Sequence, residues 1–266
     1  MTLTEMPRGI SSADDGRLRV APIACSAVTA ASPARTAPLA TGTLRVLTWN
    51  LHKQDDFGWD RDLARFLETV DIVLLQEAVL RDDLRALLDA RGLRYTMASA
   101  FIYRDVDHGV VTGAPVPPAA LCAERIDEPL FRIPKTALIA WYALAGRSDT
   151  LAVVNVHAVN FSLLEAPYEA QFAALVRALT AHRGPIVFAG DFNTWSDGRR
   201  AVVKRAADAL GLREIVFEPD LRARFLGQQV DHVMVRGLSL VSAAAIEVTS
   251  SDHNPVAVTL RLEPSH

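Results

Sequence analysis

Short apolar runs alternate with amphipathic segments along most of the chain. Runs at 44–49 and 71–76 predict two strands, because each is a nearly continuous apolar stretch of strand length. Segment 62–70 has the spacing of an amphipathic helix, and 82–92 indicates a helix that ends at Gly92, a residue type common beyond helix C-termini. The first part of the chain therefore predicts strands joined by helices.

Strand-like runs dominate the rest of the chain, where four extended pieces follow one another: YTMASAFIY, GVVTGAP, TALIAWYAL and LAVVNV. Helices are predicted at 168–184 and 198–211, with the strand PIVFAG between them. The chain closes with three strand candidates and little helix between them. The pattern predicts one mixed α/β domain, with parallel and antiparallel pairing and helices covering both faces of the sheets.

The start of the chain differs from the rest. It is rich in Ala, Ser, Thr and Pro, and it shows neither the helical nor the strand periodicity of apolar residues. We expect a disordered tail over 1–42 and a folded domain over 43–266. Arg17 and Arg19 precede the run VAPIACSAVTAA, which faintly resembles a secretory signal. Pro22 interrupts that run and two aspartates stand upstream of it, so we expect a cytoplasmic protein.

Composition narrows the function classes. Half of the residues are hydrophobic and 22% are charged, which allows a sizeable core. The net charge of -3 gives no global attraction to nucleic acids or acidic membranes, and no apolar run reaches the roughly 18–20 residues that span a bilayer. Cys25 and Cys122 lack the spacing of a zinc site or a disulfide framework, so we expect two reduced, inert thiols.

Polar residues directly follow several buried strand runs. They are Asn50, Glu77, His157 and Asp191, with Asn193 two positions further on. Ligand sites of open α/β sheets lie beyond the carboxyl ends of strands, so we expect these side chains to meet at one edge. Asp231 and the pair Asp252-His253 stand at strand starts, which antiparallel neighbours would bring to the same edge.

Each of these residues, taken alone, has an ordinary structural explanation. Asn50, Asp191 and Asn193 suit turns and helix caps. Glu77 could be a surface acid, and His157 could be a core histidine with satisfied hydrogen bonds. The whole set is harder to explain in this way, because several unrelated structural polar residues would all have to fall at the same sheet edge by chance.

The residue types favour one kind of chemistry. Carboxylates such as Glu77 and Asp252, without a Cys/His cluster, suit Mg²⁺ or Mn²⁺ rather than zinc. Mg²⁺ keeps several waters and takes one or two carboxylates together with phosphate oxygens. Asp191 would orient or deprotonate a water, and His253 or His157 would bind phosphoryl oxygens. We therefore expect a phosphate-ester substrate.

Five motifs, in order, resemble those of the endonuclease/exonuclease/phosphatase superfamily: TWN, LQE, GDFN, VDHVMV and SDHNPV. The resemblance covers about residues 43–262. More closely, WNLHKQ, NVHAVNFSLL, GDFNTWS and SDHNP resemble the YafD-like bacterial branch. The resemblance implies a four-layer α/β sandwich, in which two mixed sheets pack face to face with helices outside.

The resemblance also implies metal and substrate contacts. Glu77 resembles the principal ligand of the metal, with Asn50 and Asp252 close to the ion. Lys135, in the stretch RIPKTAL, is a further candidate contact for the substrate phosphate.

The remaining positions carry catalytic roles in this resemblance. Asp191 resembles the acid that positions the attacking water, and Asn193 the amide that steadies the phosphate. His253 resembles the essential histidine at the scissile phosphate, with Asp231 fixing its tautomer and raising its pKa. His157 matches the second histidine of the deoxyribonuclease-like branch and would also contact the substrate.

Two features bear on the substrate. Glu77 is followed by Ala78-Val79 and not by Thr-Lys, so specificity for abasic sites is not supported. Basic residues between Arg199 and Arg224 alternate with acids, which favours a solvated face over a nucleic-acid contact. The leading hypothesis is a Mg²⁺-dependent phosphodiesterase of the nuclease type. The alternatives are a phosphatase or phospholipase acting on an inositol or lipid phosphate, and a non-catalytic scaffold on the same fold.

Overall fold

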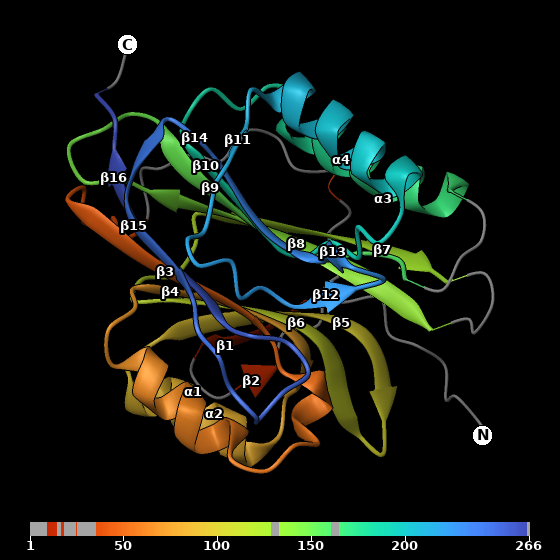
Figure 1. Ribbon diagram of the computed structural model, residues 1–266. Helices are drawn as coiled ribbons and strands as arrows, with labels where there is room; N and C mark the ends of the chain where they lie inside the picture. The colour runs from red at the N-terminus through yellow and green to blue at the C-terminus, as the bar shows by residue number, and fades with distance from the viewer. Residues whose placement is uncertain are drawn as a thin grey trace.

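The computed structural model describes residues 10–14, 17–18, 25, 36–128, 133–160 and 165–264. Within these residues, two mixed β-sheets stack face to face, and a pair of helices covers the outer side of each sheet (Figure 1). The predicted four-layer α/β sandwich is therefore confirmed.

The first sheet pairs strands from both ends of the chain. In spatial order its strands are β15 (Leu238–Ala245), β16 (Val256–Leu262), β3 (Thr43–Asn50), β4 (Ile72–Val79), β6 (Val106–Ala114), β5 (Arg94–Tyr103), β1 (Ile10–Asp14) and β2 (Arg17–Leu18). Only β3 and β4 run parallel among the described pairs of this sheet. Helices α1 (Trp59–Leu67) and α2 (Asp82–Ala90) cover its outer face (Figure 1).

The second sheet is built from the middle of the chain. In spatial order its strands are β11 (Arg213–Glu214), β14 (Asp231–Arg236), β10 (Ile186–Asp191), β9 (Thr150–His157), β8 (Pro134–Ala143) and β7 (Ala120–Asp127). Helices α3 (Ala166–Leu179) and α4 (Asp197–Leu210) lie on its outer face (Figure 1). A short hairpin, β12 (Arg224–Phe225) and β13 (Gln228–Gln229), precedes β14.

Three apolar layers hold the sandwich together. Neighbouring side chains of a strand point to opposite faces, so Val46 of β3 enters the core between the sheets while Leu47 packs under α1 and α2. Val153 of β9 belongs to the same layer as Val46, between the two sheets. Phe188 of β10 packs with Phe172 in the third layer, between the second sheet and its helices. The alternation of apolar residues therefore decides which layer each strand residue joins.

A polar pair joins the two sheets inside this apolar interior. Gln76 of β4 donates from Nε2 to Oδ1 of Asn155 of β9 at 2.7 Å. Asn155 in turn donates from Nδ2 to the backbone oxygens of Leu75 (3.2 Å) and Val111 (2.9 Å). Both side chains are fully buried, with 0% exposure. Since an unpaired buried amide is costly, this pair fixes the register of the two sheets next to the strand ends.

The segment before residue 43 contacts the domain at described positions. Strand β1 pairs antiparallel with β5. Leu39 is buried, and its amide donates to the backbone oxygen of Ala143 at 2.8 Å. The boundary at residue 43 stays a prediction, and most of the predicted tail lies outside the described residues. None of the helices described is long and apolar enough to cross a membrane.

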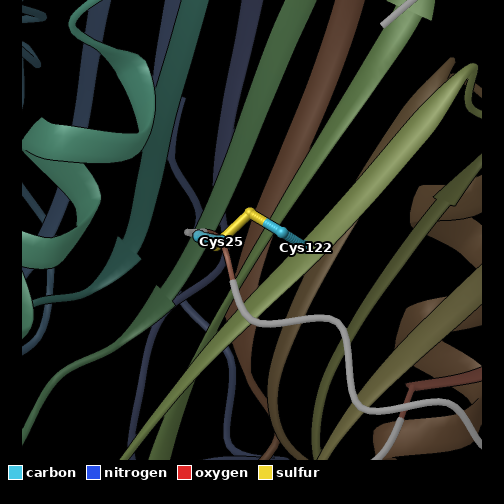
Figure 2. The surroundings of a disulfide bond; sticks show 2 residues. All are labelled: Cys25 and Cys122. Carbon is cyan, nitrogen blue, oxygen red and sulfur yellow. A yellow bond between two sulfur atoms is a disulfide. The ribbon is translucent and has the colours of Figure 1, made fainter. Parts of the chain in front are cut away.

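Cys25 and Cys122 form a disulfide that attaches this segment to strand β7 (Figure 2). The expectation of two reduced thiols was therefore wrong. The cysteines are 97 positions apart, and both are buried. Spacing patterns identify compact disulfide frameworks and metal sites. A single long-range bond depends instead on tertiary proximity, which the sequence did not reveal.

Candidate active site

Strand register brings the predicted residues to one edge of the sandwich. His157 at the end of β9 pairs with Asp191 at the end of the parallel strand β10, and Asp191 pairs with Asp231 at the start of the antiparallel strand β14. In the other sheet, the last residue of β3, Asn50, pairs with Gln76 of the parallel strand β4. The prediction that strand ends and antiparallel starts would converge is borne out.

A β-bulge places Glu77 at this edge. The pairing of β4 with β6 shifts between Leu75 and Ala78, and Glu77 has a positive φ of 46°. Bulges turn a side chain away from the regular alternation of a strand, and a positive φ is costly for a residue with a Cβ. The strand thus departs from regular geometry at the carboxylate that the resemblance assigns to the metal.

Three basic side chains surround the Glu77 carboxylate. Lys53 Nζ lies 3.0 Å from Oε2, whereas Lys135 Nζ and His157 Nε2 lie 3.7 and 3.5 Å from Oε1. Burial alone would raise the pKa of Glu77, but the neighbouring basic side chains of His157, Lys135 and Lys53 lower it to about 2. The carboxylate is therefore ionised at neutral pH.

The short loop that supplies Lys53 is strained. His52, Lys53 and Gln54 have consecutive φ angles of 46°, 58° and 62°. Gln54 holds the loop against the bulged strand, because its Oε1 accepts a 2.9 Å hydrogen bond from the amide of Val79. Strain of this kind persists only where surrounding contacts enforce it. Lys53 is a site residue that the sequence analysis missed, although it lies in the motif WNLHKQ.

Two asparagines hold the carboxylate of Asp191. Asn50 Nδ2 and Asn193 Nδ2 approach Oδ2 at 3.1 and 3.2 Å, and the amide of Asn193 donates to Oδ1 at 3.0 Å. Burial raises the pKa of Asp191, His253 lowers it and Asp231 raises it again, giving a value of about 6. A carboxylate with a pKa near neutrality suits a general base.

Asp231 and His253 form a buried ion pair. His253 Nδ1 lies 2.8 Å from Oδ2 of Asp231. Burial alone would lower the pKa of His253, but the charge and hydrogen bond of Asp231 raise it to about 10. Two hydrogen bonds anchor the loop of His253 to β3. Trp49 Nε1 donates to the backbone oxygen of His253, and Ser251 Oγ donates to the backbone oxygen of Asn50.

His157 is held by a lysine. Lys135 Nζ lies 2.8 Å from His157 Nε2, and both side chains are buried. Because an ammonium group can only donate, Nε2 accepts and the ring is neutral in this arrangement. Burial and the charge of Lys135 lower the pKa of His157 well below its ordinary value. Lys135 is thus the cation at this position, next to Glu77 and His157.

Asp252 lies at the rim of the site. Its side chain is 58% exposed, and Oδ2 lies 3.9 Å from Nε2 of His52. The described residues contain no group of three or more His, Cys, Asp or Glu side chains arranged to hold a metal. Zinc needs such a cluster, whereas Mg²⁺ binds through one or two carboxylates and keeps its waters.

The carboxylate at the bulge suits such a hard ion. Oε2 of Glu77 is buried and accepts no hydrogen bond of good geometry, its contact being the ion pair with Lys53. A buried, ionised oxygen of this kind is a natural cation ligand. The roles predicted from the resemblance stay predictions, but all of their residues except Asp252 are buried or largely buried at one sheet edge.

Comparison with known proteins places this geometry in context. Residues 47–253 match the Endonuclease/Exonuclease/phosphatase family. A UPF0294 protein of Vibrio parahaemolyticus is 40% identical over 222 residues, which cover 83% of this chain and 79% of that protein. Such UPF0294 proteins are YafD-like bacterial proteins.

Solved structures share the fold at lower identity. An endonuclease/exonuclease/phosphatase from Beutenbergia cavernae superposes with a TM-score of 0.65 at 20% identity, covering 84% of this chain and 72% of that chain. D. rerio TDP2 complexed with single strand DNA product superposes with a TM-score of 0.60 at 19% identity, covering 82% of this chain and 99% of that chain.

Proposed function

Because the chain belongs to the endonuclease/exonuclease/phosphatase family, we propose that it is a metal-dependent hydrolase of phosphate esters that cleaves phosphodiesters. The main support is that a carboxylate held by two asparagines, Asp191, and an imidazole paired with an aspartate, His253, lie at the same sheet edge. The pKa of Asp191 is about 6, and the pKa of His253 is about 10. A carboxylate that can accept a proton and a charged imidazolium are thus available together at neutral pH, as is typical of active sites.

The proposed cofactor is Mg²⁺, with Mn²⁺ as a substitute. Glu77 would be its main ligand, with Asn50 and Asp252 beside it. Such an ion would supply charge stabilisation for a phosphoryl oxygen. Glu77 is ionised, and its buried Oε2 faces the ammonium group of Lys53, which a bound cation would displace.

Side chains of the protein would activate the attacking water and bind the phosphoryl group. Asp191 would accept a proton from the attacking water, while Asn50 and Asn193 keep its carboxylate in place. His253, charged through its pairing with Asp231, would bind a phosphoryl oxygen and stabilise the negative charge that develops there. Lys135 would add a second cation on the Glu77 side.

Two classes of phosphate ester fit this site. Nucleic acid is one candidate, since TDP2, a protein of the same fold, has been seen with a single-stranded DNA product. A phosphate monoester, such as an inositol or lipid phosphate, is the second candidate. Lys53 and Lys135 support it, because two ammonium groups near Glu77 would compensate the extra charge of a monoester.

The cytoplasmic location expected from the sequence now has an observation against it. Cys25 and Cys122 are disulfide-bonded, and disulfides persist mainly in oxidising compartments. We therefore propose that the protein works outside a strongly reducing environment. Alkylating free thiols in intact cells before lysis measures the redox state directly, and two free thiols in the isolated protein would refute this location.

The decisive experiment compares wild type with His253→Ala on plasmid DNA, single-stranded DNA, RNA, phosphoinositides and sphingomyelin, with Mg²⁺ or with EDTA. The matched control is His182→Ala, because His182 contacts the backbone oxygen of Pro185 and no residue of the site. Metal-dependent cleavage in wild type and the control, absent in His253→Ala, supports the proposal and identifies the substrate class. Folded wild-type protein that binds Mg²⁺ but cleaves nothing contradicts it.

A further inference from the structure

The neighbouring strands β10 and β14 each contribute an aspartate to the site, and an aromatic residue directly follows each aspartate. Asp191 is followed by Phe192, and Asp231 is followed by His232. Because neighbouring residues point to opposite faces, the aspartates face the site while Phe192 and His232 stack on the other side, with ring centroids 5.2 Å apart. His232 is therefore buried directly behind the catalytic strand ends.

His232 lies in the middle of a chain of short contacts. Its Nε2 is 2.6 Å from Oγ1 of Thr194, and its Nδ1 is 2.7 Å from Oε1 of Glu214. Thr194 Oγ1 also donates its proton to the backbone oxygen of Gln229 at 2.7 Å. Thr194 and His232 are buried, with 1% and 8% exposure.

Hydrogen-bond accounting sets the direction of this chain. The only proton of the Thr194 hydroxyl goes to Gln229, so the hydroxyl must accept from His232 Nε2. A carboxylate only accepts, so Nδ1 of His232 donates to Glu214. The ring of His232 therefore bridges the Glu214 carboxylate and the Thr194 hydroxyl.

The contact chain ends at the residue that holds Asp191. Thr194 follows Asn193, which has a positive φ of 50°. Asn193 binds Asp191 through both its backbone amide and its side chain. Asparagine adopts this conformation more readily than other non-glycine residues, and contacts of the flanking residues hold it here. Thr194, fixed by two short hydrogen bonds, is one of these restraints.

Glu214 is linked to the other catalytic aspartate as well. Arg222 Nη1 lies 3.2 Å from Oε1 of Glu214 and donates to the backbone oxygen of Asp231 at 3.1 Å. Burial would raise the pKa of Glu214, but its contacts with His232 and Arg222 lower it. One carboxylate on the edge strand β11 thus supports both strand ends that carry Asp191 and Asp231.

We propose that Glu214, His232 and Thr194 form a positioning relay that holds Asn193, and through it Asp191, in the geometry needed for catalysis. The relay deepens the proposed hydrolase function and rests on it. These are positioning residues, because none of the three is among the groups assigned to the metal, the water or the phosphate.

Thr194 is the best position at which to test the relay. Arg199 also binds the backbone oxygen of Asn193, at 3.2 Å, but it binds those of Val159 and Asn160 too, so its removal would disturb two loops together. Thr194→Val keeps the side-chain shape and removes the hydroxyl, whereas Thr194→Ser keeps the hydroxyl and removes the methyl group. Lys204→Gln is the control, because Lys204 lines the same 370 Å³ hollow as His232 but pairs with Asp208.

The experiment measures kcat and KM with bis(p-nitrophenyl) phosphate and Mg²⁺, the affinity for Mg²⁺ by calorimetry, and hydrogen exchange of residues 191–196. Thr194→Val should lower kcat about 10-fold to 100-fold with little change in KM, as expected for a misplaced catalytic group. Its Mg²⁺ affinity should match wild type, and its 191–196 segment should exchange faster. Thr194→Ser should retain most of the wild-type kcat, and Glu214→Gln should fall between the two threonine variants.

If Thr194 and His232 act as one unit, their substitutions should not have additive effects on kcat. The double variant Thr194→Val/His232→Phe should be no slower than Thr194→Val alone, because both changes break the same relay. The inference is overturned if Thr194→Val keeps kcat within about twofold of wild type, if Thr194→Ser is as slow as Thr194→Val, or if the two losses multiply.

Failure of the proposed hydrolase function gives a different result from failure of the relay. A wild type that is inactive on bis(p-nitrophenyl) phosphate and on the whole substrate panel refutes the hydrolase proposal, and hydrogen exchange then tests the relay by itself. In that case unchanged exchange of 191–196 in Thr194→Val overturns the inference, and faster exchange, with the Lys204→Gln control unchanged, supports it.

Discussion

Asp231 and His253 are 22 positions apart in the sequence, and Oδ2 of the aspartate lies 2.8 Å from Nδ1 of the histidine. The contact joins the start of β14 in one sheet to the loop before β16 in the other. It therefore connects the two sheets at the site. It also keeps His253 charged, because the charge and hydrogen bond of Asp231 outweigh the effect of burial and raise the pKa of His253 to about 10.

Asp231→Asn should move the alkaline limb of the pH–rate profile. Wild-type activity requires charged His253, so it should fall as the pH rises through about 10. Without the aspartate charge, the pKa of His253 should drop toward its ordinary value of 6.5, and the limb should move with it. Asp208→Asn, which breaks only a surface pair with Lys204, is the control. An unchanged limb in Asp231→Asn would show that His253 titration does not govern the rate.

The acid limb of the pH–rate profile should follow the ionisation of Asp191. This carboxylate must be ionised to accept a proton, so activity should rise as the pH increases through about 6, the pKa of Asp191. Asp191→Asn should lower kcat by about 10²-fold to 10⁴-fold, the usual contribution of a general base. Steady-state rates between pH 4 and pH 8, about two units either side of that pKa, test both statements. A variant with wild-type kcat would remove Asp191 from the mechanism.

Glu77→Gln should weaken the binding of Mg²⁺. The substitution keeps the shape but replaces an ionised ligand with a neutral amide, so calorimetry should show at least about a 10-fold loss of affinity. Glu169→Gln is the matched control, because Glu169 pairs with Arg205 on the surface of α3 and α4. Equal affinity in wild type and Glu77→Gln would mean that another group binds the ion.

The sequence predicted the convergence of the site because that convergence follows from strand direction. Polar residues at the ends of parallel strands share an edge, and Asp191 and His157 indeed pair in register. The bulge at Glu77 and the left-handed turn at Lys53 could not be predicted, since no glycine or asparagine marks their positive φ angles. These conformations are imposed by tertiary contacts, such as the hydrogen bond from Val79 to Gln54.

The polar pair in the core was also missed, for a related reason. Gln76 and Asn155 stand inside apolar strand runs, and each looks like an isolated exception in its own strand. Their meaning appears only when the two sheets stack and the side chains meet at 2.7 Å. Long-range pairs of this kind depend on how layers pack, which periodicity within one strand does not encode.

Asn155→Ala should destabilise the fold. The change removes the shortest hydrogen bond of Gln76 Nε2 and the side-chain donor to the backbone oxygens of Leu75 and Val111. Urea unfolding should show a loss of about 2–4 kcal/mol, because buried groups that lose a hydrogen bond retain their desolvation cost. The double variant Gln76→Leu/Asn155→Leu should recover part of this loss, since it removes both polar partners. A loss below about 0.5 kcal/mol in Asn155→Ala, the level of a surface substitution, would contradict this account.

Breaking the disulfide should lower stability while leaving the chemistry intact. The bond joins Cys25 to Cys122 across 97 positions, so it restricts the unfolded chain strongly. Cys25→Ser and Cys122→Ser should each reduce the free energy of unfolding by about 2–5 kcal/mol.

The double variant and the reduced wild type should match the single variants, since all four states lack the same bond. The kcat of the folded variants should equal that of wild type, because neither cysteine contacts a site residue assigned here. If reduction leaves the unfolding midpoint unchanged while alkylation shows both thiols free, the bond does not stabilise the fold. If the variants lose kcat while folded, the N-terminal segment takes part in forming the site, and the domain boundary predicted at residue 43 must move toward the N-terminus.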